Sequence, residues 1–195
     1  SSPLKNISAN TPKDVIYELV GTFETMWNPE KSPGMLTQDK TLVIAEALHS
    51  AFHNLCSESN ALILLSIEGA EGAPYTPVTK YLDTPMHTFL FNGLPHREVF
   101  DELIRNYKFY NNNNADNDQK TNLCDQEQVC LSLPIHLAVT SELDADVIFS
   151  CKYIYDKGCL TKVDTSQCTP LHRCCRSARC RVDILKRILE TQDGK

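Results

Sequence analysis

Apolar residues recur at helical spacing along most of the chain, in stretches that turn-forming residues separate. The first stretch follows Thr11-Pro12, where the Thr11 hydroxyl is predicted to cap a helix and Pro12 suits its first position. A break at Asn28-Pro29 and Pro33-Gly34 ends this helix. Its apolar positions are Val15, Ile16, Leu19, Val20, Phe23 and Met26.

After this helix the apolar stretches come in pairs. In each pair a turn separates two stretches of helical period, which predicts a series of helical hairpins. Gly93 is predicted to end the first helix of the second pair, and Gly69 to end the second helix of the first pair. The paired stretches are 42–55 with 61–67, 86–90 with 99–104, 135–139 with 147–154, and 171–175 with 184–189.

A four-residue pattern recurs in the first stretch of each pair. Thr169-Pro170-Leu171-His172 is nearly repeated by Thr84-Pro85-Met86-His87. Leu133-Pro134-Ile135-His136 keeps the type of the last three positions, and Glu46-Ala47-Leu48-His49 keeps only Leu and His. The intervals between the four histidines are 38, 49 and 36 residues. A period of roughly 20–50 residues is typical of a stacked repeat array.

The pattern has a physical role at a helix start. The Thr hydroxyl accepts a hydrogen bond from a first-turn amide, Pro gives up an amide that has no partner there, and the apolar residue points into the stack. The His ring can bond the Thr hydroxyl with one nitrogen and a backbone carbonyl of the next unit with the other. We therefore predict structural roles for Thr84, Pro85, His87, Pro134, His136, Thr169, Pro170 and His172.

These residues resemble the ankyrin repeat family over about residues 40–191. Asp83-Thr84-Pro85-Met86-His87 and Thr169-Pro170-Leu171-His172 are close to the family hallmark, and the segment 183–190 is similar to the family's second helix. In the third unit Leu133 replaces the capping Thr. The resemblance implies an all-α solenoid of about four helix-turn-helix repeats, which binds partner proteins along its concave face and loop tips without chemistry of its own.

Two regions follow from this interpretation. We expect an N-terminal helical cap over 1–39 and an ankyrin-like repeat domain over 40–195, with units at about 40–80, 81–128, 129–162 and 163–195. The second unit ends in a segment, 110–128, that is expected to be a flexible insertion. This segment opens on an Asn tract and is polar throughout, so it cannot bury enough apolar surface to order itself.

Composition and charge restrict the class of partner and the compartment. The 195 residues are 42% apolar, which suffices for a sizeable core, and the net charge of −6 argues against nucleic-acid binding. From Cys168 to Lys195, however, seven Lys and Arg oppose three Asp and Glu. Nine cysteines follow no regular framework, and no signal segment or membrane-length apolar run occurs. We expect reduced thiols, an intracellular location, cytoplasmic or nuclear, and no membrane partner.

Two sharper hypotheses concern the cysteines. A catalytic Cys–His pair has no supporting motif, because the chain contains no phosphate-binding loop, dinucleotide fingerprint or nucleophile elbow, so no catalytic residue is predicted. A zinc site lacks a Cys-x-x-Cys pair, and helical period assigns Cys174 and Cys175 to a packed face, so neither metal nor cofactor is expected. The ligand types that a zinc site would use are Cys168, His172, Cys174, Cys175 and Cys180.

Arginines supply one set of candidate partner-binding residues. Arg173 and Arg176 share a helix face and are either a solvated surface or a basic patch for an acidic segment of a partner. Aromatic residues supply another, since Tyr107, Phe109 and Tyr110 either anchor a partner or pack beneath the following loop. The resemblance alone adds three groove-facing positions on first helices: Thr88, Phe91 and Thr140.

The sequence therefore predicts a non-enzymatic protein–protein interaction module with a rigid, pre-ordered surface. One alternative is the substrate-recognition or regulatory region of a larger enzyme or of a secreted host-directed effector, which flanking sequence would distinguish. Another is a redox or metal sensor built on the cysteines, which thiol titration and metal analysis would reveal.

Overall fold

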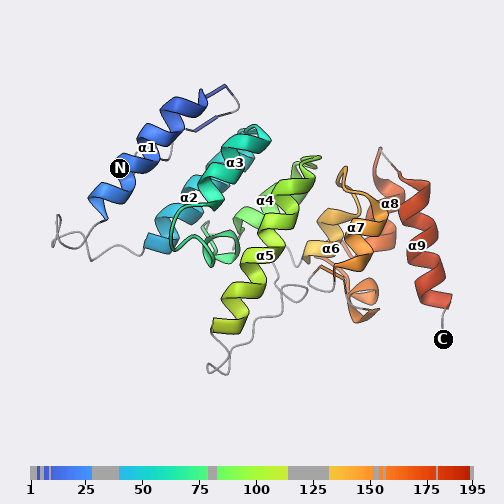
Figure 1. The fold of residues 1–195 in the computed structure, drawn as a ribbon. Helices are drawn as coiled ribbons and strands as arrows, with labels where there is room; N and C mark the ends of the chain where they lie inside the picture. The colour runs from blue at the N-terminus through green and yellow to red at the C-terminus, as the bar shows by residue number, and fades with distance from the viewer. Residues whose placement is uncertain are drawn as a thin grey trace.

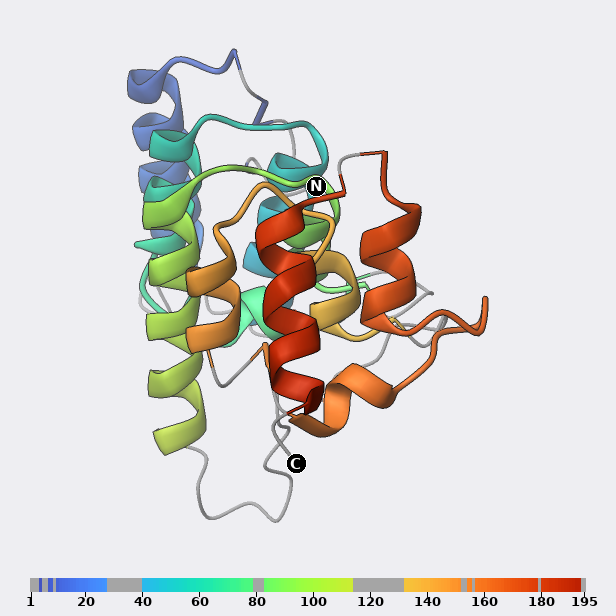
Figure 2. The same ribbon diagram turned by 90° about the vertical axis from the view of Figure 1, so that its right-hand side faces the viewer.

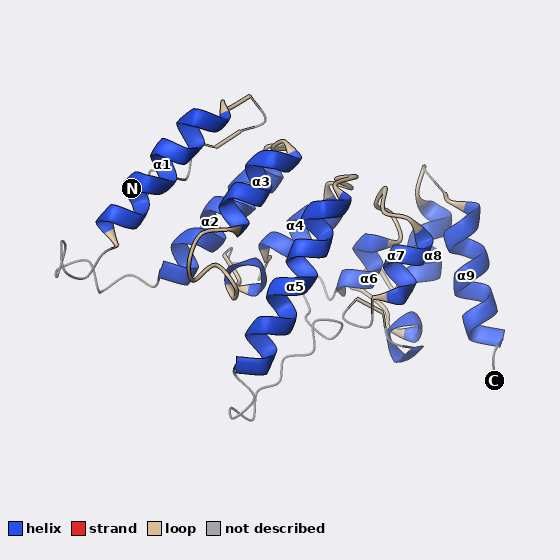
Figure 3. Ribbon diagram, viewed as in Figure 1, coloured by secondary structure: helices blue, strands red, loops and turns tan. Residues whose placement is uncertain are grey.

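The computed structural model describes residues 4, 7–8, 10–27, 40–78, 83–113, 132–151, 154–155, 157–178 and 180–193. Within these residues the regular structure is entirely helical, as the apolar period predicts (Figure 3). The helices follow one another in a row, with α1 at one end and α9 at the other (Figure 1).

The α-helices vary in length along the row, from five residues in α6 to seventeen in α5. The first half contains α1 (Lys13–Met26), α2 (Lys40–His53), α3 (Glu58–Leu65), α4 (Pro85–Phe91) and α5 (Arg97–Asn113). The second half contains α6 (Pro134–Ala138), α7 (Ala145–Ser150), α8 (Pro170–Arg176) and α9 (Val182–Asp193). The 3-10 helices η2 (Ala73–Tyr75) and η4 (Lys157–Thr161) lie in the connections.

The helices pack in two layers. In one layer α2, α4, α6 and α8 contact one another in succession. In the other, α1 packs on α3, α3 on α5, and α7 on α9. The hairpins α2–α3 and α8–α9 join the layers, and Figure 2 looks along the row so that α8 and α9 lie side by side. This arrangement presents one helix of each successive pair on the same side of the molecule.

A continuous apolar core runs between the layers. Phe52 of α2 meets Phe89 of α4 edge to face, with ring centroids 5.3 Å apart, and Asn92 Nδ2 donates to the Phe52 carbonyl at 2.8 Å. Burying a side chain of this size contributes about 1.5–3 kcal/mol. The largest fully buried side chains include Phe23, Phe52, Phe89, Leu48, Leu64, Met86, Leu90 and Leu103.

The predicted caps are confirmed at two helix starts. Thr84 Oγ1 accepts from the His87 amide at 3.2 Å, and Thr169 Oγ1 accepts from the His172 amide at 3.4 Å. Pro85 and Pro170 are the first residues of α4 and α8. In α6 the residue before the helix is a leucine without a hydroxyl, and its amide instead donates to His136 Nδ1 at 3.1 Å.

Other local predictions are wrong. Thr11 does not cap α1, because its hydroxyl accepts from the Ser8 amide at 2.9 Å within the preceding turn, and Pro12 occupies the cap position. Cys175 and Leu189 were expected to face inward, yet both are exposed, Leu189 by 43%.

Two boundaries also differ from expectation. α2 begins at Lys40, so Glu46-Ala47 lies inside a helix rather than at its start. α5 continues to Asn113, into the segment 110–128 that was expected to be an insertion, and residues 114–131 lie outside the described part. The His49 alignment nevertheless has structural support: Leu55 has a left-handed φ of 53° six residues after His49, as Gly93 has a φ of 65° six residues after His87.

Candidate partner-binding surface

Four residues occupy the same position in successive helical pairs. His53, Phe91, Thr140 and Arg176 each lie four residues after one of the recurrent histidines, and we call them the first-helix row. They are carried at or just after the C-terminal ends of α2, α4, α6 and α8, which contact one another in succession. Phe91 is 73% exposed, whereas Thr140 is half-buried and its hydroxyl donates to the Leu137 carbonyl at 2.9 Å. His53 and Arg176 are exposed.

The other predicted groove residue of α4 is not available to a partner. Thr88 lies one residue after His87 and is only 8% exposed. Its hydroxyl donates to the Thr84 carbonyl at 3.3 Å, one helical turn back. Thr88 is therefore part of the packed start of α4, and its prediction as a binding residue is wrong. The equivalent position in α8 is Arg173, which is half-buried.

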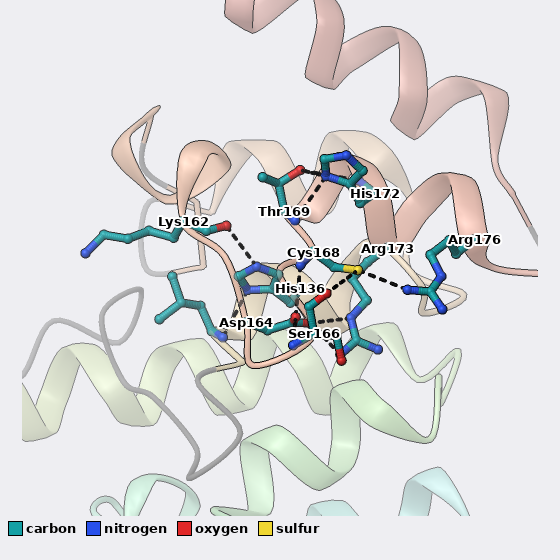
Figure 4. A network of polar contacts seen from close by, with 10 residues as sticks. His136, Lys162, Asp164, Ser166, Cys168, Thr169, His172, Arg173 and Arg176 are labelled. Atoms are coloured by element: carbon teal, nitrogen blue, oxygen red, sulfur yellow. Dashed lines mark hydrogen bonds and ion pairs between the residues drawn. The ribbon is translucent and has the colours of Figure 1, made fainter.

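Arg173 is held by a buried carboxylate in the loop before α8 (Figure 4). Asp164 is fully buried and accepts from the amides of Ser166 at 2.8 Å and Cys168 at 3.1 Å. Arg173 Nε donates to the same carboxylate at 2.5 Å, and its Nη2 forms an ion pair with it. Burial by itself opposes ionisation of Asp164, but the two amides and the guanidinium outweigh it and lower the pKa of the carboxyl.

The two arginines of α8 consequently differ in their contacts. The charge of Arg173 is balanced by Asp164, so this side chain ties α8 to the loop before it. Arg176 is exposed, and its Nη1 donates to Cys168 Sγ at 3.2 Å.

His136 connects the start of α6 to the loop that leads to α8. Its Nε2 lies 3.2 Å from the Lys162 carbonyl, while its Nδ1 accepts from the Leu133 amide at 3.1 Å (Figure 4). The second ring nitrogen thus meets a backbone carbonyl, as predicted for the recurrent histidines, but residue 162 is the last of the predicted third unit rather than part of the next one. Burial lowers the pKa of His136, and the Lys162 carbonyl opposes this shift only in part.

Sequence reasoning missed a histidine pair at the first-helix row. The rings of His49 and His53 stack on α2 with centroids 6.3 Å apart and an interplanar angle of 7°. Burial lowers the pKa of His49; nearby Asp83 raises it, and His53 lowers it further. The i, i+4 spacing of the two histidines was the sequence signal that could have identified the pair.

Of the aromatic candidates on α5, the structure describes one side chain. Tyr107 is buried, with its ring centroid 4.9 Å from that of Tyr75. The Tyr75 hydroxyl donates to the Leu103 carbonyl, which anchors η2 against α5. The packed alternative is therefore correct for Tyr107. The side chains of Phe109 and Tyr110 lie outside the described part.

A groove of about 570 Å³ opens on the opposite layer, where the N-terminal ends of α5, α7 and α9 converge. Its charges are mixed, because carboxylates and cations both line it, and one of the carboxylates, Asp183, already pairs with Arg181 just before α9. The groove therefore presents no single charge to a ligand. It is lined by Arg97, Asp144, Ala145, Asp146, Val147, Asp183, Lys186, Arg187 and Glu190.

Cys56, Cys168, Cys174, Cys175 and Cys180 are free thiols. Among the described residues, no group of three or more His, Cys, Asp or Glu side chains is arranged to hold a metal ion. In the same residues no helix has the length and apolarity needed to cross a membrane.

Comparison of the chain with models of known protein families and with curated proteins finds no match. The geometry of the surface is thus the basis on which a function can be argued.

Proposed function

We propose that this chain is a non-enzymatic protein-binding module, built as a solenoid of about four ankyrin-like repeats with α1 as an N-terminal helical cap. The observation that carries the proposal is the first-helix row, which places one side chain of each pair on the same side of neighbouring helices. Thr84 and Thr169 support it, because equivalent motif positions form equivalent caps 85 residues apart.

The chemistry of the row favours a protein partner. Phe91 offers a large apolar side chain that is already exposed, and aromatic anchors of this kind dominate the energetics of protein interfaces. Arg176 supplies a positive charge at the other end of the row, which suits an acidic segment of the partner. Because packed helices hold these side chains, little conformational entropy is lost on docking. We place this function in the cytoplasm or nucleus.

The test is a quantitative comparison of captured proteins. Full-length chain carrying Phe91→Asp or Arg176→Glu is used as bait beside the unaltered chain, and bound proteins are quantified by mass spectrometry. The matched control is Tyr17→Asp, which changes another exposed aromatic residue, 62% exposed on α1. We expect a protein that the unaltered chain and the control retain but Phe91→Asp loses.

Purified partner then allows a direct affinity measurement. Loss of an interface anchor costs about 2 kcal/mol or more, which corresponds to a roughly 30-fold rise in Kd for Phe91→Asp. Arg176→Glu is expected to weaken binding more at low salt than at high salt. Equal capture by the unaltered chain and both row variants, with unchanged thermal midpoints, would exclude the first-helix row as the binding surface.

A further inference from the structure

Two thiols are brought together by the turn between α8 and α9. Cys174 is fully buried on α8, and Cys180 is exposed immediately before α9. The Ser177 amide donates to the Cys174 carbonyl at 3.3 Å, and the Cys180 amide donates to the Ser177 carbonyl at 3.1 Å. These two successive hydrogen-bonded turns fold the chain back on itself, and Cys174 Sγ lies 3.9 Å from the carbonyl oxygen of Arg181.

The contact with the Arg181 carbonyl places the Cys174 side chain beside the residue that follows Cys180. Burial foremost, and then the proximity of Cys180, raise the pKa of the Cys174 thiol to about 11. Thiolates rather than thiols are the nucleophiles, so a buried thiol with a raised pKa attacks slowly, whereas an exposed thiol meets reagents directly. Cys180 is therefore the thiol that encounters a soluble oxidant, and Cys174 is placed to react second.

We propose that Cys174 and Cys180 form a redox-active dithiol, which closes to a disulfide by exchange with a low-molecular-weight disulfide such as oxidised glutathione. In the first step the Cys180 thiolate attacks one sulfur of oxidised glutathione, a mixed disulfide forms, and one glutathione thiolate leaves. In the second step the Cys174 thiolate attacks the Cys180 sulfur, the mixed disulfide breaks, and the second glutathione leaves. The two protein thiols lose two electrons and two protons, which the oxidised glutathione gains.

The neighbouring cysteines are less suited to either step. Cys175 is exposed but adjacent to Cys174 in α8, and consecutive helical side chains do not face each other. Cys168 is buried, its sulfur is contacted by Arg176 Nη1, and it lies before α8 rather than in the turn after it. Cys175 is therefore the matched control for Cys180: both thiols are exposed, and only Cys180 has Cys174 as its partner.

Closure of the disulfide would affect the candidate surface. The ring formed by residues 174–180 includes Arg176, the charged member of the first-helix row. It would link the C-terminal part of α8 covalently to the segment that precedes α9. The inference does not depend on the proposed function, since disulfide formation is measured on the isolated chain.

The experiment uses the purified full-length chain, equilibrated in glutathione buffers of increasing oxidised fraction, quenched with an alkylating agent and analysed by intact mass and peptide mapping. We expect the oxidised chain to carry two fewer alkyl groups than the reduced chain, in addition to the loss of two hydrogens, and a linked peptide that joins Cys174 to Cys180. Cys175→Ser should behave as the unaltered chain does. Cys180→Ser should form no such link, and Cys174→Ala should stop at a glutathione adduct on Cys180.

The outcomes are decisive even where a variant is unstable. Cys180→Ser changes an exposed side chain and should therefore fold. If Cys174→Ala does not fold, the comparison of Cys180→Ser with the unaltered chain still tests the proposal. A link between any other pair of cysteines would overturn the proposal. So would glutathione adducts on Cys180 that never resolve in the unaltered chain, or an absence of any link across the glutathione series.

Discussion

Replacing Asp164 by Ala tests whether a single buried carboxylate holds the last helical pair in place. The substitution leaves the buried amide of Cys168 without its acceptor, which costs about 1–3 kcal/mol. It also removes a turn bond to the exposed Ser166 amide and an ion pair to the half-buried Arg173, each contributing about 0.5–1 kcal/mol because water partly replaces them. The free energy of unfolding should fall by about 3 kcal/mol.

The matched control is Asp101→Ala, which removes a carboxylate from an exposed i, i+4 ion pair with Arg97. That pair is worth about 0.3–0.5 kcal/mol, and the better helix propensity of Ala offsets part of it. Calorimetry should therefore show a thermal midpoint lowered by about 9 °C for Asp164→Ala and by about 1 °C or less for Asp101→Ala. Amide exchange should accelerate in α8 and not in α2. Equal midpoints for the two variants would refute the role assigned to the buried carboxylate.

Three further predictions concern single side chains. Leu55→Gly should raise the free energy of unfolding by about 0.5–1 kcal/mol in urea titrations, because it relieves a left-handed φ of 53°. The control Leu189→Gly lies inside α9 and should lower the free energy of unfolding by about 1 kcal/mol. A destabilising effect of Leu55→Gly would contradict this prediction. Because burial lowers the pKa of His136 below its ordinary 6.5, the folded state favours the neutral ring. Stability should hold above pH 6.5 and fall progressively below it, with a flatter pH profile in His136→Gln; coincident profiles would exclude this contribution. Thr84→Ala should lower the thermal midpoint more than Thr169→Ala, since the Thr84 cap is buried and the Thr169 cap is exposed. The reverse order of thermal midpoints would contradict the contribution assigned to the buried cap.

Local chemistry explains which features the sequence could predict. The caps at Thr84 and Thr169 depend on residues three positions apart, so the motif alone contains the geometry. Helical period likewise identifies the apolar faces, because a helix repeats its faces every 3.6 residues. The prediction for the start of α1 was wrong for a local reason as well. The Thr11 hydroxyl could accept from an amide of the helix or from one of the preceding turn, and it accepts from the Ser8 amide in the turn.

Contacts between distant residues could not be predicted from the pattern. The pairing of Asp164 with Arg173 depends on the path of the loop between them, which includes a left-handed φ of 55° at Gln167. Glutamine is not a residue type from which a left-handed conformation is predicted. Thr88 was predicted from the resemblance as a groove-facing residue, but it is only 8% exposed. Cys175 was assigned to the packed face by helical period, but it is exposed.

Three consecutive helices near the end of the row are short, and their short length bears on both proposals. Apolar side chains are nevertheless fully buried along the whole row, including Ile135, Ile148, Ile154, Ile184 and Ile188. α6, α7 and α8 have five, six and seven residues, and helices shorter than about 12 residues do not hold themselves in water. Their order depends on polar ties such as the Asp164 carboxylate and the 2.5 Å bond from Arg181 Nη1 to the Leu143 carbonyl. A partner at Arg176 or a disulfide at Cys174 would therefore act on a part of the row where a few polar contacts hold short helices in place.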